Sequence, residues 1–270
     1  MSLSRKELLD EMGLSPQWVV RETPVVREQP AAKVAAPAPR SPVIEAPVVP
    51  PVSVRPGPIV SPSPVANESG QVADAADVAQ MDWPTLRQTI LDCRVCGLCA
   101  KRTQAVPGVG DEQADWLFIG EGPGAEEDAR GEPFVGQAGR LLDAMLAAID
   151  LARDDNVYIA NAVKCRPPGN RTPEAAEMAA CWPYLKRQIA LVRPKVIVLL
   201  GKAAVHAVLG EDGSLASMRG KTLSYRDGDS EVPVVVTYHP AYLLRNLPDK
   251  AKAWEDLCRA RRVMRGLASA

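Results

Sequence analysis

From about residue 81 onward, short apolar runs alternate with segments of helical periodicity. Four runs are short and almost wholly apolar, as expected for buried strands: Trp116–Ile119, Val157–Ile159, Val196–Leu200 and Val234–Val236. Between and after them, apolar residues at helical spacing predict helices at Gln137–Ile149, Pro173–Leu191, Lys202–Leu209 and Asp249–Arg265. Strands that alternate with helices predict an α/β fold, in which helices cover both faces of a parallel sheet.

Residues 21–79 have a different composition, rich in Pro, Ala and Val and nearly free of aromatic side chains. Such a segment buries too little apolar surface to offset the entropy of ordering the chain, so we expect a disordered linker. Before it, residues 1–20 predict a short amphipathic helix, either a frayed terminus or a peptide that binds a protein partner. We place the globular domain at residues 80–270, with a first helix that opens at Trp83–Pro84 and ends at the first cysteines.

The charge of the chain is balanced, with 32 basic and 33 acidic side chains among 270 residues and a formal net charge of −1. Its overall field therefore predicts no partner, and any nucleic-acid surface must be a local patch. The chain has no run of about eighteen apolar residues, and its first ten residues are polar and charged, unlike a signal peptide. We expect a cytoplasmic monomer with no membrane partner. Six cysteines in a reducing compartment favour a metal site or unreactive thiols over disulfides.

Polar or conformationally unusual residues follow each predicted strand. They are Gly120–Gly124 after the first strand, Asn161 after the second, Gly201 after the third and His239 after the fourth. Because the carboxyl ends of parallel strands meet at one edge of a sheet, we expect these residues to line one crevice. The glycine-rich turn matches neither the dinucleotide fingerprint nor the Walker loop, and the carboxylates that follow it disfavour phosphate.

Three side chains indicate recognition of a base and acid–base chemistry: two of this group and one aromatic residue from a separate segment. His239 lies between a strand and Pro240, where a neutral or charged imidazole can act at the crevice. The carboxamide of Asn161 offers a donor and an acceptor, which complement the imide edge of a base. Phe134 lies in an irregular segment, and either stacks on a base or packs in the core.

Two distant cysteine pairs predict a tetrathiolate site. Cys93 and Cys96 form a CxxC pair, and Cys165 and Cys181 follow in the middle of the domain. This spacing suits either zinc or an iron–sulfur cluster. Cys99 extends the local string to CxxCxxC and invites a further ligand.

The chain resembles the family 4 uracil-DNA glycosylases, the iron–sulfur branch of the uracil-DNA glycosylase superfamily, from about Asp92 to Met264. Several separate strings agree with that family in order and spacing: Cys93–Cys96, Gly120–Gly124 with Glu126–Asp128, Pro133–Gly136, Asn161–Pro168, Cys181, and His239–Asn246. The resemblance implies a three-layer α/β/α sandwich with a central four-stranded parallel sheet. It also implies removal of uracil from DNA and a [4Fe–4S] cluster on Cys93, Cys96, Cys165 and Cys181. Cys99 is not used in the family pattern, and we expect Cys258 to be a buried thiol.

The resemblance also assigns roles at the crevice. Asn161 is expected to read N3 and O4 of an extruded uracil, Phe134 to stack on its ring, and His239 to donate toward O2 of the departing base. Glu121 is expected to position or activate water, and Glu127 to line the pocket near C5 and disfavour thymine.

One departure from the superfamily pattern concerns the general base that activates water. The best-known branch of the superfamily has a water-activating aspartate where this chain has Gly122, so the identity of the base stays open.

The segment after His239 resembles the superfamily loop that enters the minor groove. Leu243, Leu244 and Arg245 are its candidates for contacts with DNA, with a helical start packed on the sheet as the alternative. For the phosphates we expect contacts from basic residues near the rim: Lys164, Arg166, Arg171 and Arg245.

Two other functions compete. A cross-linking relative in the same superfamily traps DNA through a histidine in an inserted basic loop, but the chain has no insertion after Phe134, and Glu121 stands where that group has glutamine. A non-catalytic iron–sulfur module is the second alternative, although it does not require a strand-end trio of carboxylate, amide and imidazole.

Overall fold

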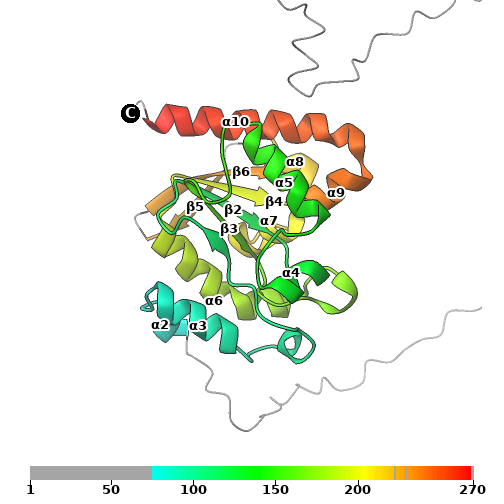
Figure 1. Ribbon diagram of the computed structural model, residues 1–270. Helices are drawn as coiled ribbons and strands as arrows, with labels where there is room; N and C mark the ends of the chain where they lie inside the picture. Colours follow the sequence, from blue (N-terminus) through cyan, green and yellow to red (C-terminus); the bar gives the residue numbers. More distant parts are fainter. Residues whose placement is uncertain (1–74, 222, 229, 269–270) are drawn as a thin grey trace, which may run out of the picture. The chain divides into compact units, whose positions relative to one another are not determined.

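A mixed six-stranded sheet forms the centre of the domain in the computed structural model, which describes residues 75–268 except 222 and 229 (Figure 1). The strand order is β1-β3-β2-β4-β6-β5. The strands are β1 (Val109–Gly110), β2 (Trp116–Gly120), β3 (Val157–Asn161), β4 (Val196–Leu200), β5 (Leu223–Asp227) and β6 (Ser230–Thr237). The inner four, β3, β2, β4 and β6, are parallel, whereas β1 and β5 pair antiparallel at the two edges. The predicted α/β fold is confirmed, but the prediction of a four-stranded sheet is wrong, because the edge strands β1 and β5 were missed.

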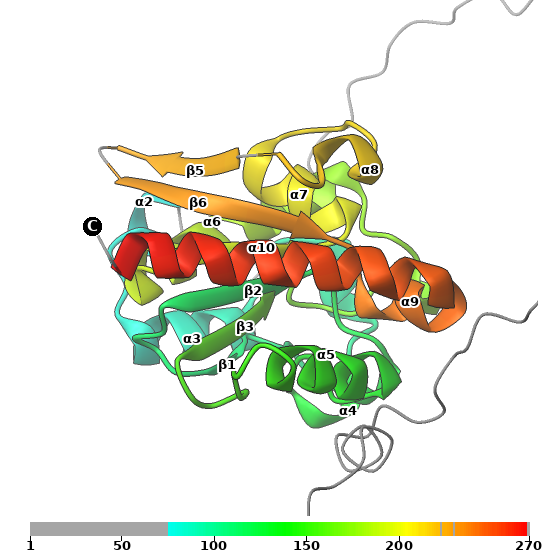
Figure 2. The same cartoon turned by 90° about the horizontal axis from the view of Figure 1, so that it is seen from above.

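Helices cover both faces of the sheet (Figure 2). The helices are α2 (Ala75–Val78), α3 (Trp83–Asp92), α4 (Ala125–Arg130), α5 (Gln137–Ala147), α6 (Ala175–Val192), α7 (Lys202–Leu209), α8 (Leu215–Met218), α9 (Pro240–Arg245) and α10 (Lys250–Ala268). Three 3₁₀ turns lie between them, η1 (Gly97–Ala100), η2 (Pro168–Asn170) and η3 (Leu247–Asp249). The four helices predicted between and after the strands therefore exist. Helix α7 has the predicted ends, and the ends of α5, α6 and α10 differ by up to three residues, as terminal turns commonly do.

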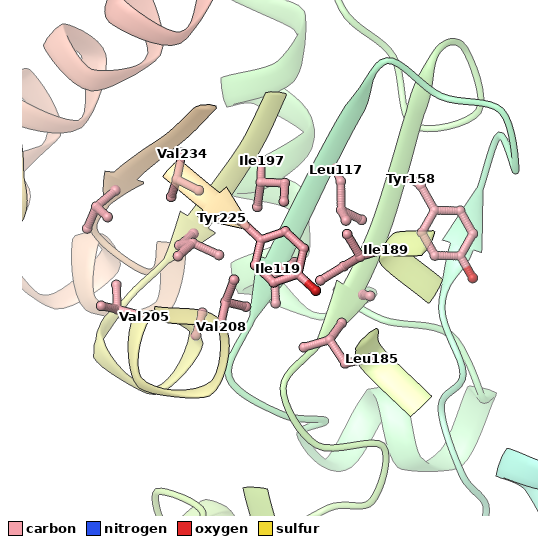
Figure 3. Packing of buried hydrophobic residues seen from close by; sticks show 14 of the residues in the cluster. Leu117, Ile119, Tyr158, Leu185, Ile189, Ile197, Val205, Val208, Tyr225 and Val234 are labelled. Atoms are coloured by element: carbon pink, nitrogen blue, oxygen red, sulfur yellow. The ribbon is translucent and has the colours of Figure 1, made fainter. Parts of the chain in front are cut away.

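Successive side chains of each inner strand pack into different cores, so these strands are continuous apolar runs. On one face Leu117, Ile119 and Ile197 pack against Leu185 and Ile189 of α6 (Figure 3). The other face packs against α5, α9 and α10 through a second cluster of buried side chains. Because both faces are covered, the carboxyl edge of the inner strands remains the place where their loops meet.

Residues before the expected domain boundary at residue 80 pack with the domain. Helix α2 lies within the segment expected to be linker, and its Val78 is 1% exposed in a cluster with Leu86, Ile90 and Tyr184. The apolar residue that ends this short helix therefore belongs to the domain. The helix expected within residues 1–20, and the linker up to residue 74, lie outside the described residues. None of the described helices has the length and apolar character needed to cross a membrane.

Candidate active site

A cavity of about 610 Å³ opens where the loops after the inner strands meet. Its lining includes Glu121 after β2, Asn161 at the end of β3, Gly201 after β4 and His239 after β6. The structure thus brings together residues that are far apart in the sequence, at the edge that the alternation of strands and helices predicted. The same cavity is lined by Gly122, Glu127, Phe134 and Arg245.

Asn161 presents an unsatisfied acceptor. Its side chain is 2% exposed, and its Oδ1 atom has no hydrogen-bond partner within the described structure. A buried oxygen without a donor costs about 1–3 kcal/mol. The neighbouring Gly120 leaves no space for a side chain, since a Cβ there would lie 2.5 Å from Oδ1 and 2.5 Å from Cζ of Phe134. The carboxamide is therefore held in a tight position and is available to a donor in the cavity.

His239 is arranged as a neutral hydrogen-bond donor. Its Nδ1 accepts from the backbone N–H of Ala241 at 3.2 Å, as the N-cap of α9. In a neutral ring the proton must then reside on Nε2. Burial of the ring, and secondly the charge of Arg245, lower the pKa of His239 to about 4, with Glu127 acting weakly in the opposite direction. The imidazole is thus uncharged at neutral pH.

Phe134 lies against His239, with ring centroids 5.3 Å apart and planes inclined by 30°. It is 5% exposed and belongs to the core cluster beneath α5, so the expected core packing is confirmed. It also lines the cavity, and stacking on a base stays a prediction. Its φ of 56° is left-handed, which a bulky residue adopts only when neighbours hold it. Arg153 provides that support, because its guanidinium donates to the carbonyl oxygens of Pro133 at 2.8 Å and Phe134 at 2.7 Å.

Glu127 binds the surrounding loop rather than projecting a free carboxylate. Its Oε2 accepts from the N–H of Gly124 at 3.0 Å, and its Oε1 accepts from Val135 at 3.0 Å and Gly136 at 3.1 Å. These bonds tie the turn after β2 to the segment that carries Phe134. The sequence indicated a pocket position for Glu127 but not its hydrogen bonds to the loop. The three backbone donors meet its carboxylate only in the folded chain.

Glu121 is the second carboxylate of the cavity wall. Burial raises its pKa above the ordinary value, and a hydrogen bond with Thr172 partly opposes the rise. Thr172 lies in the loop between β3 and α6, which forms part of the same wall. The group is therefore held by the segment that connects Cys165 with Cys181.

The segment after His239 forms α9, the helical alternative considered for it. Leu243 is 1% exposed in the core on that face, so it cannot serve as the wedge expected from the sequence. Leu244 is 38% exposed, and Leu247 in η3, which the sequence did not single out, is 60% exposed. These two leucines and Arg245 form the outward surface beside the cavity.

One predicted phosphate contact is wrong, and two others have partners within the protein. Lys164 is 2% exposed, and its Nζ donates to the carbonyl oxygen of Asn161 at 2.8 Å and to Oε1 of Gln188 at 2.6 Å. A buried ammonium cannot contact DNA, so that expectation is wrong. Arg171 does line the cavity, but it pairs with Glu177 at 2.6 Å. Arg166 is half-buried and donates to Oδ1 of Asn170 at 2.7 Å.

The four predicted cysteine ligands line a second, small cavity together with Cys99. Cys165 and Cys181 are buried, whereas Cys93 and Cys96 are half-buried. Burial raises the pKa of Cys165 to about 11 and that of Cys181 to about 12. Over the described residues, no three Cys, His, Asp or Glu side chains converge closely enough to hold a single metal ion. Cys258, expected to be buried, is partly exposed on α10.

Donors already point at these sulfurs. The guanidinium of Arg102 lies 2.8 Å from Sγ of Cys165, and the backbone N–H of Lys164 lies 3.4 Å from Sγ of Cys181. Hydrogen bonds of this kind stabilise thiolate ligands of a bound metal group. The sulfurs of both cysteine pairs thus surround one cavity, and they provide a thiolate donor set for a metal group.

Comparison with known proteins agrees with this geometry. Residues 107–258 match the family model of the uracil DNA glycosylase superfamily. The chain is 43% identical over 175 residues to a type-4 uracil-DNA glycosylase of Sulfurisphaera tokodaii, covering 63% of this chain and 79% of that protein. It is 46% identical over 159 residues to the type-4 protein of Archaeoglobus fulgidus, with 57% and 79% covered. For the type-4 protein of Thermotoga maritima the values are 42% over 177 residues, with 64% and 90% covered. The chain therefore belongs to the uracil-DNA glycosylase superfamily, and within it to the type-4 uracil-DNA glycosylases.

Proposed function

We propose that the protein hydrolyses the N-glycosidic bond of uracil in DNA and leaves an abasic site. The observation that carries this proposal is the unpartnered Oδ1 of Asn161 in a cavity that also contains the Nε2 donor of His239. Uracil offers a matching set, a donor at N3 and acceptors at O2 and O4. Cytosine has an acceptor at N3 and donors at N4, so it would leave the carboxamide oxygen without a donor.

Base recognition requires that uracil leave the stack. A base in a duplex is shielded, so the nucleotide must swing out into the cavity, at an unstacking cost of a few kcal/mol. Asn161 would accept from N3 and donate toward O4, and Phe134 would pack against the ring. The pairing would supply the donor that Oδ1 of Asn161 lacks in the free protein.

Cleavage places negative charge on the departing uracil and positive charge on the sugar. His239 would donate its Nε2 proton as a hydrogen bond toward O2 and stabilise the leaving anion, an effect commonly worth about 3–4 kcal/mol. An uncharged imidazole suits this role, because its proton position is already fixed by the bond from Ala241 to Nδ1.

The carboxylates would act on water and on the shape of the pocket. Glu121 is placed to position a water molecule and to stabilise the cationic sugar when ionised. Glu127 would set the wall near C5, and its three backbone hydrogen bonds make that wall rigid, which disfavours the methyl group of thymine. The best-known branch of the superfamily has a water-activating aspartate at the position of Gly122. This chain has no side chain there that could act as the general base.

DNA would be held beside the cavity by the outward surface of α9 and η3. Leu244 and Leu247 provide exposed apolar side chains, and Arg245 provides a neighbouring cation. Apolar side chains of this kind fill the space that an extruded base leaves, and the cation contacts phosphate.

We also propose that Cys93, Cys96, Cys165 and Cys181 hold a [4Fe–4S] cluster. The donor set, the shared cavity and the hydrogen bonds to Cys165 and Cys181 fit such a group. When bound, it would fasten the segment after α3 to the loop and helix that form the cavity wall, and its role there is structural. Broad absorption of the purified protein at about 400 nm would support the cluster. A colourless, zinc-loaded protein would contradict it.

A cleavage assay tests the proposed activity. An end-labelled oligonucleotide with one uracil is incubated with the protein and then treated with alkali, which breaks the strand at abasic sites. We expect cleavage at uracil and none at thymine or cytosine in the same sequence. No strand break would refute the proposal, and a protein–DNA adduct that survives denaturation would favour the cross-linking alternative.

A further inference from the structure

Lys164 is buried where a lysine is costly unless its donors are used. Its Nζ donates to the backbone carbonyl oxygen of Asn161 and to the side-chain Oε1 of Gln188, and both acceptors are neutral. Among the ion pairs of the described residues, none joins Lys164 to a carboxylate. The ammonium group thus holds two specific oxygens, and the side chain also lines the cavity of the cysteines.

The first of these oxygens ends strand β3. Asn161 is the last residue of β3 and pairs with Gly120 of β2. After it the chain leaves the sheet, with the N–H of Ala162 on the carbonyl of Gly120 at 2.9 Å. Lys164 folds back three residues along the chain to bind the carbonyl of Asn161. It therefore caps the strand at the residue whose side chain enters the cavity.

The second oxygen belongs to a residue that is itself fixed. Gln188 is 1% exposed on α6, and its Nε2 donates to the carbonyl oxygen of Pro107 at 2.8 Å. Cys181 lies about two turns earlier on the same helix, hence on the same face. The backbone of Lys164 also contacts Sγ of Cys181. The hydrogen bonds of Lys164 and Gln188 thus connect β3, α6 and the segment before β1.

We infer that Lys164 and Gln188 form a positioning link that fixes the carboxamide of Asn161 toward the cavity. The link rests on the proposed function, because it acts through the residue proposed to read uracil. Neither residue lines the cavity, so neither touches the base. The link holds the backbone carbonyl of Asn161, while its Oδ1 lies close to Gly120, in the space that a Cβ there would need. Loss of the link therefore lets the end of β3, and the carboxamide with it, shift.

Two variants test the link. Lys164→Met removes both hydrogen bonds of Nζ and keeps an unbranched side chain of similar length. The double variant Lys164→Met/Gln188→Leu also removes the buried Oε1 acceptor, which limits the loss of stability. We expect kcat for uracil release to fall at least about tenfold in both variants, because an Å-scale misplacement of a recognition group can cost up to about a hundredfold. The visible absorbance per protein should not change, which shows that the cluster is kept.

A cycle with Asn161→Ala separates positioning from general stability. If Lys164 acts through Asn161, then Lys164→Met should lower kcat in the wild type but not further in the Asn161→Ala background. Ile189→Ala, a core truncation on the same helix as Gln188, should lower the melting temperature and leave kcat within about twofold. An equal loss of kcat from Lys164→Met in both backgrounds, or an unchanged kcat in the wild-type background, would overturn the inference.

A readout without DNA keeps the inference independent of the proposed activity. In ¹⁵N–¹H spectra the side-chain amide signals of Asn161 should shift or broaden in Lys164→Met and stay in place in Ile189→Ala. Signals that do not move would overturn the link. If the wild type released no uracil, the proposed function would be refuted, but the amide signals of Asn161 would still test the link.

Discussion

Gly120 is the position where one added methyl group should disable the site without unfolding the domain. In Gly120→Ala the new Cβ would lie 2.5 Å from Oδ1 of Asn161 and 2.5 Å from Cζ of Phe134. Ordinary contacts of this kind begin at about 3.4 Å, so one or both groups must shift by close to 1 Å, and overpacking typically costs about 1–3 kcal/mol. A displacement of that size at a group that reads the base predicts a loss of about a hundredfold in the rate of uracil release.

Single-turnover release of uracil, measured with enzyme in excess, reports this loss without interference from product dissociation. Gly266→Ala is the matched control, because a Cβ at that position of α10 meets nothing within 4 Å. It should keep the wild-type rate and stabilise the helix by up to about 1 kcal/mol. If Gly120→Ala released uracil at the wild-type rate, the position assigned to the carboxamide would be refuted.

Three further predictions concern His239, the cysteine site and Glu127. Because the pKa of His239 is lowered from 6.5 to about 4, the unfolded chain takes up this proton first as the pH falls. The unfolding free energy should therefore fall by up to about 3 kcal/mol between about pH 6.5 and 4. Urea titrations should find this part of the pH dependence in the wild type and not in His239→Asn. Cys165→Ser should abolish the visible absorbance and lower the melting temperature, whereas Cys99→Ser should keep the absorbance; full absorbance in Cys165→Ser would exclude it as a ligand. Glu127→Gln should lower unfolding free energy by about 1–3 kcal/mol in urea, because a backbone donor loses its acceptor. An equal effect of the exposed Glu126→Gln would show that the charge alone matters.

The sequence predicted the inner sheet because each of its strands is buried on both faces. A continuous apolar run such as Val196–Leu200 is too short for a buried helix and is typical of a strand covered on both sides. The edge strands lack this pattern, since β1 has only two residues and β5 mixes exposed Arg226 with buried Tyr225. Their pairing depends on neighbours that are distant in the chain, which local patterns do not report.

At the site, the sequence located residues better than it assigned their contacts. Residues that follow the inner strands were brought together because strand direction fixes where they lie. The side chains of Lys164, Leu243 and Glu127 differ from expectation for one reason: whether a polar or apolar side chain turns inward depends on its tertiary partners. A lysine beside Arg166 in a loop-like string gives no local sign of burial.

The central claim is that the cavity holds uracil between the carboxamide of Asn161 and the imidazole of His239. A crystal structure of the protein with free uracil measures this directly. We predict the base in the cavity with N3 about 3 Å from Oδ1 of Asn161 and O2 about 3 Å from Nε2 of His239. Uracil bound elsewhere, or bound in the cavity without contact to Asn161, would contradict the account.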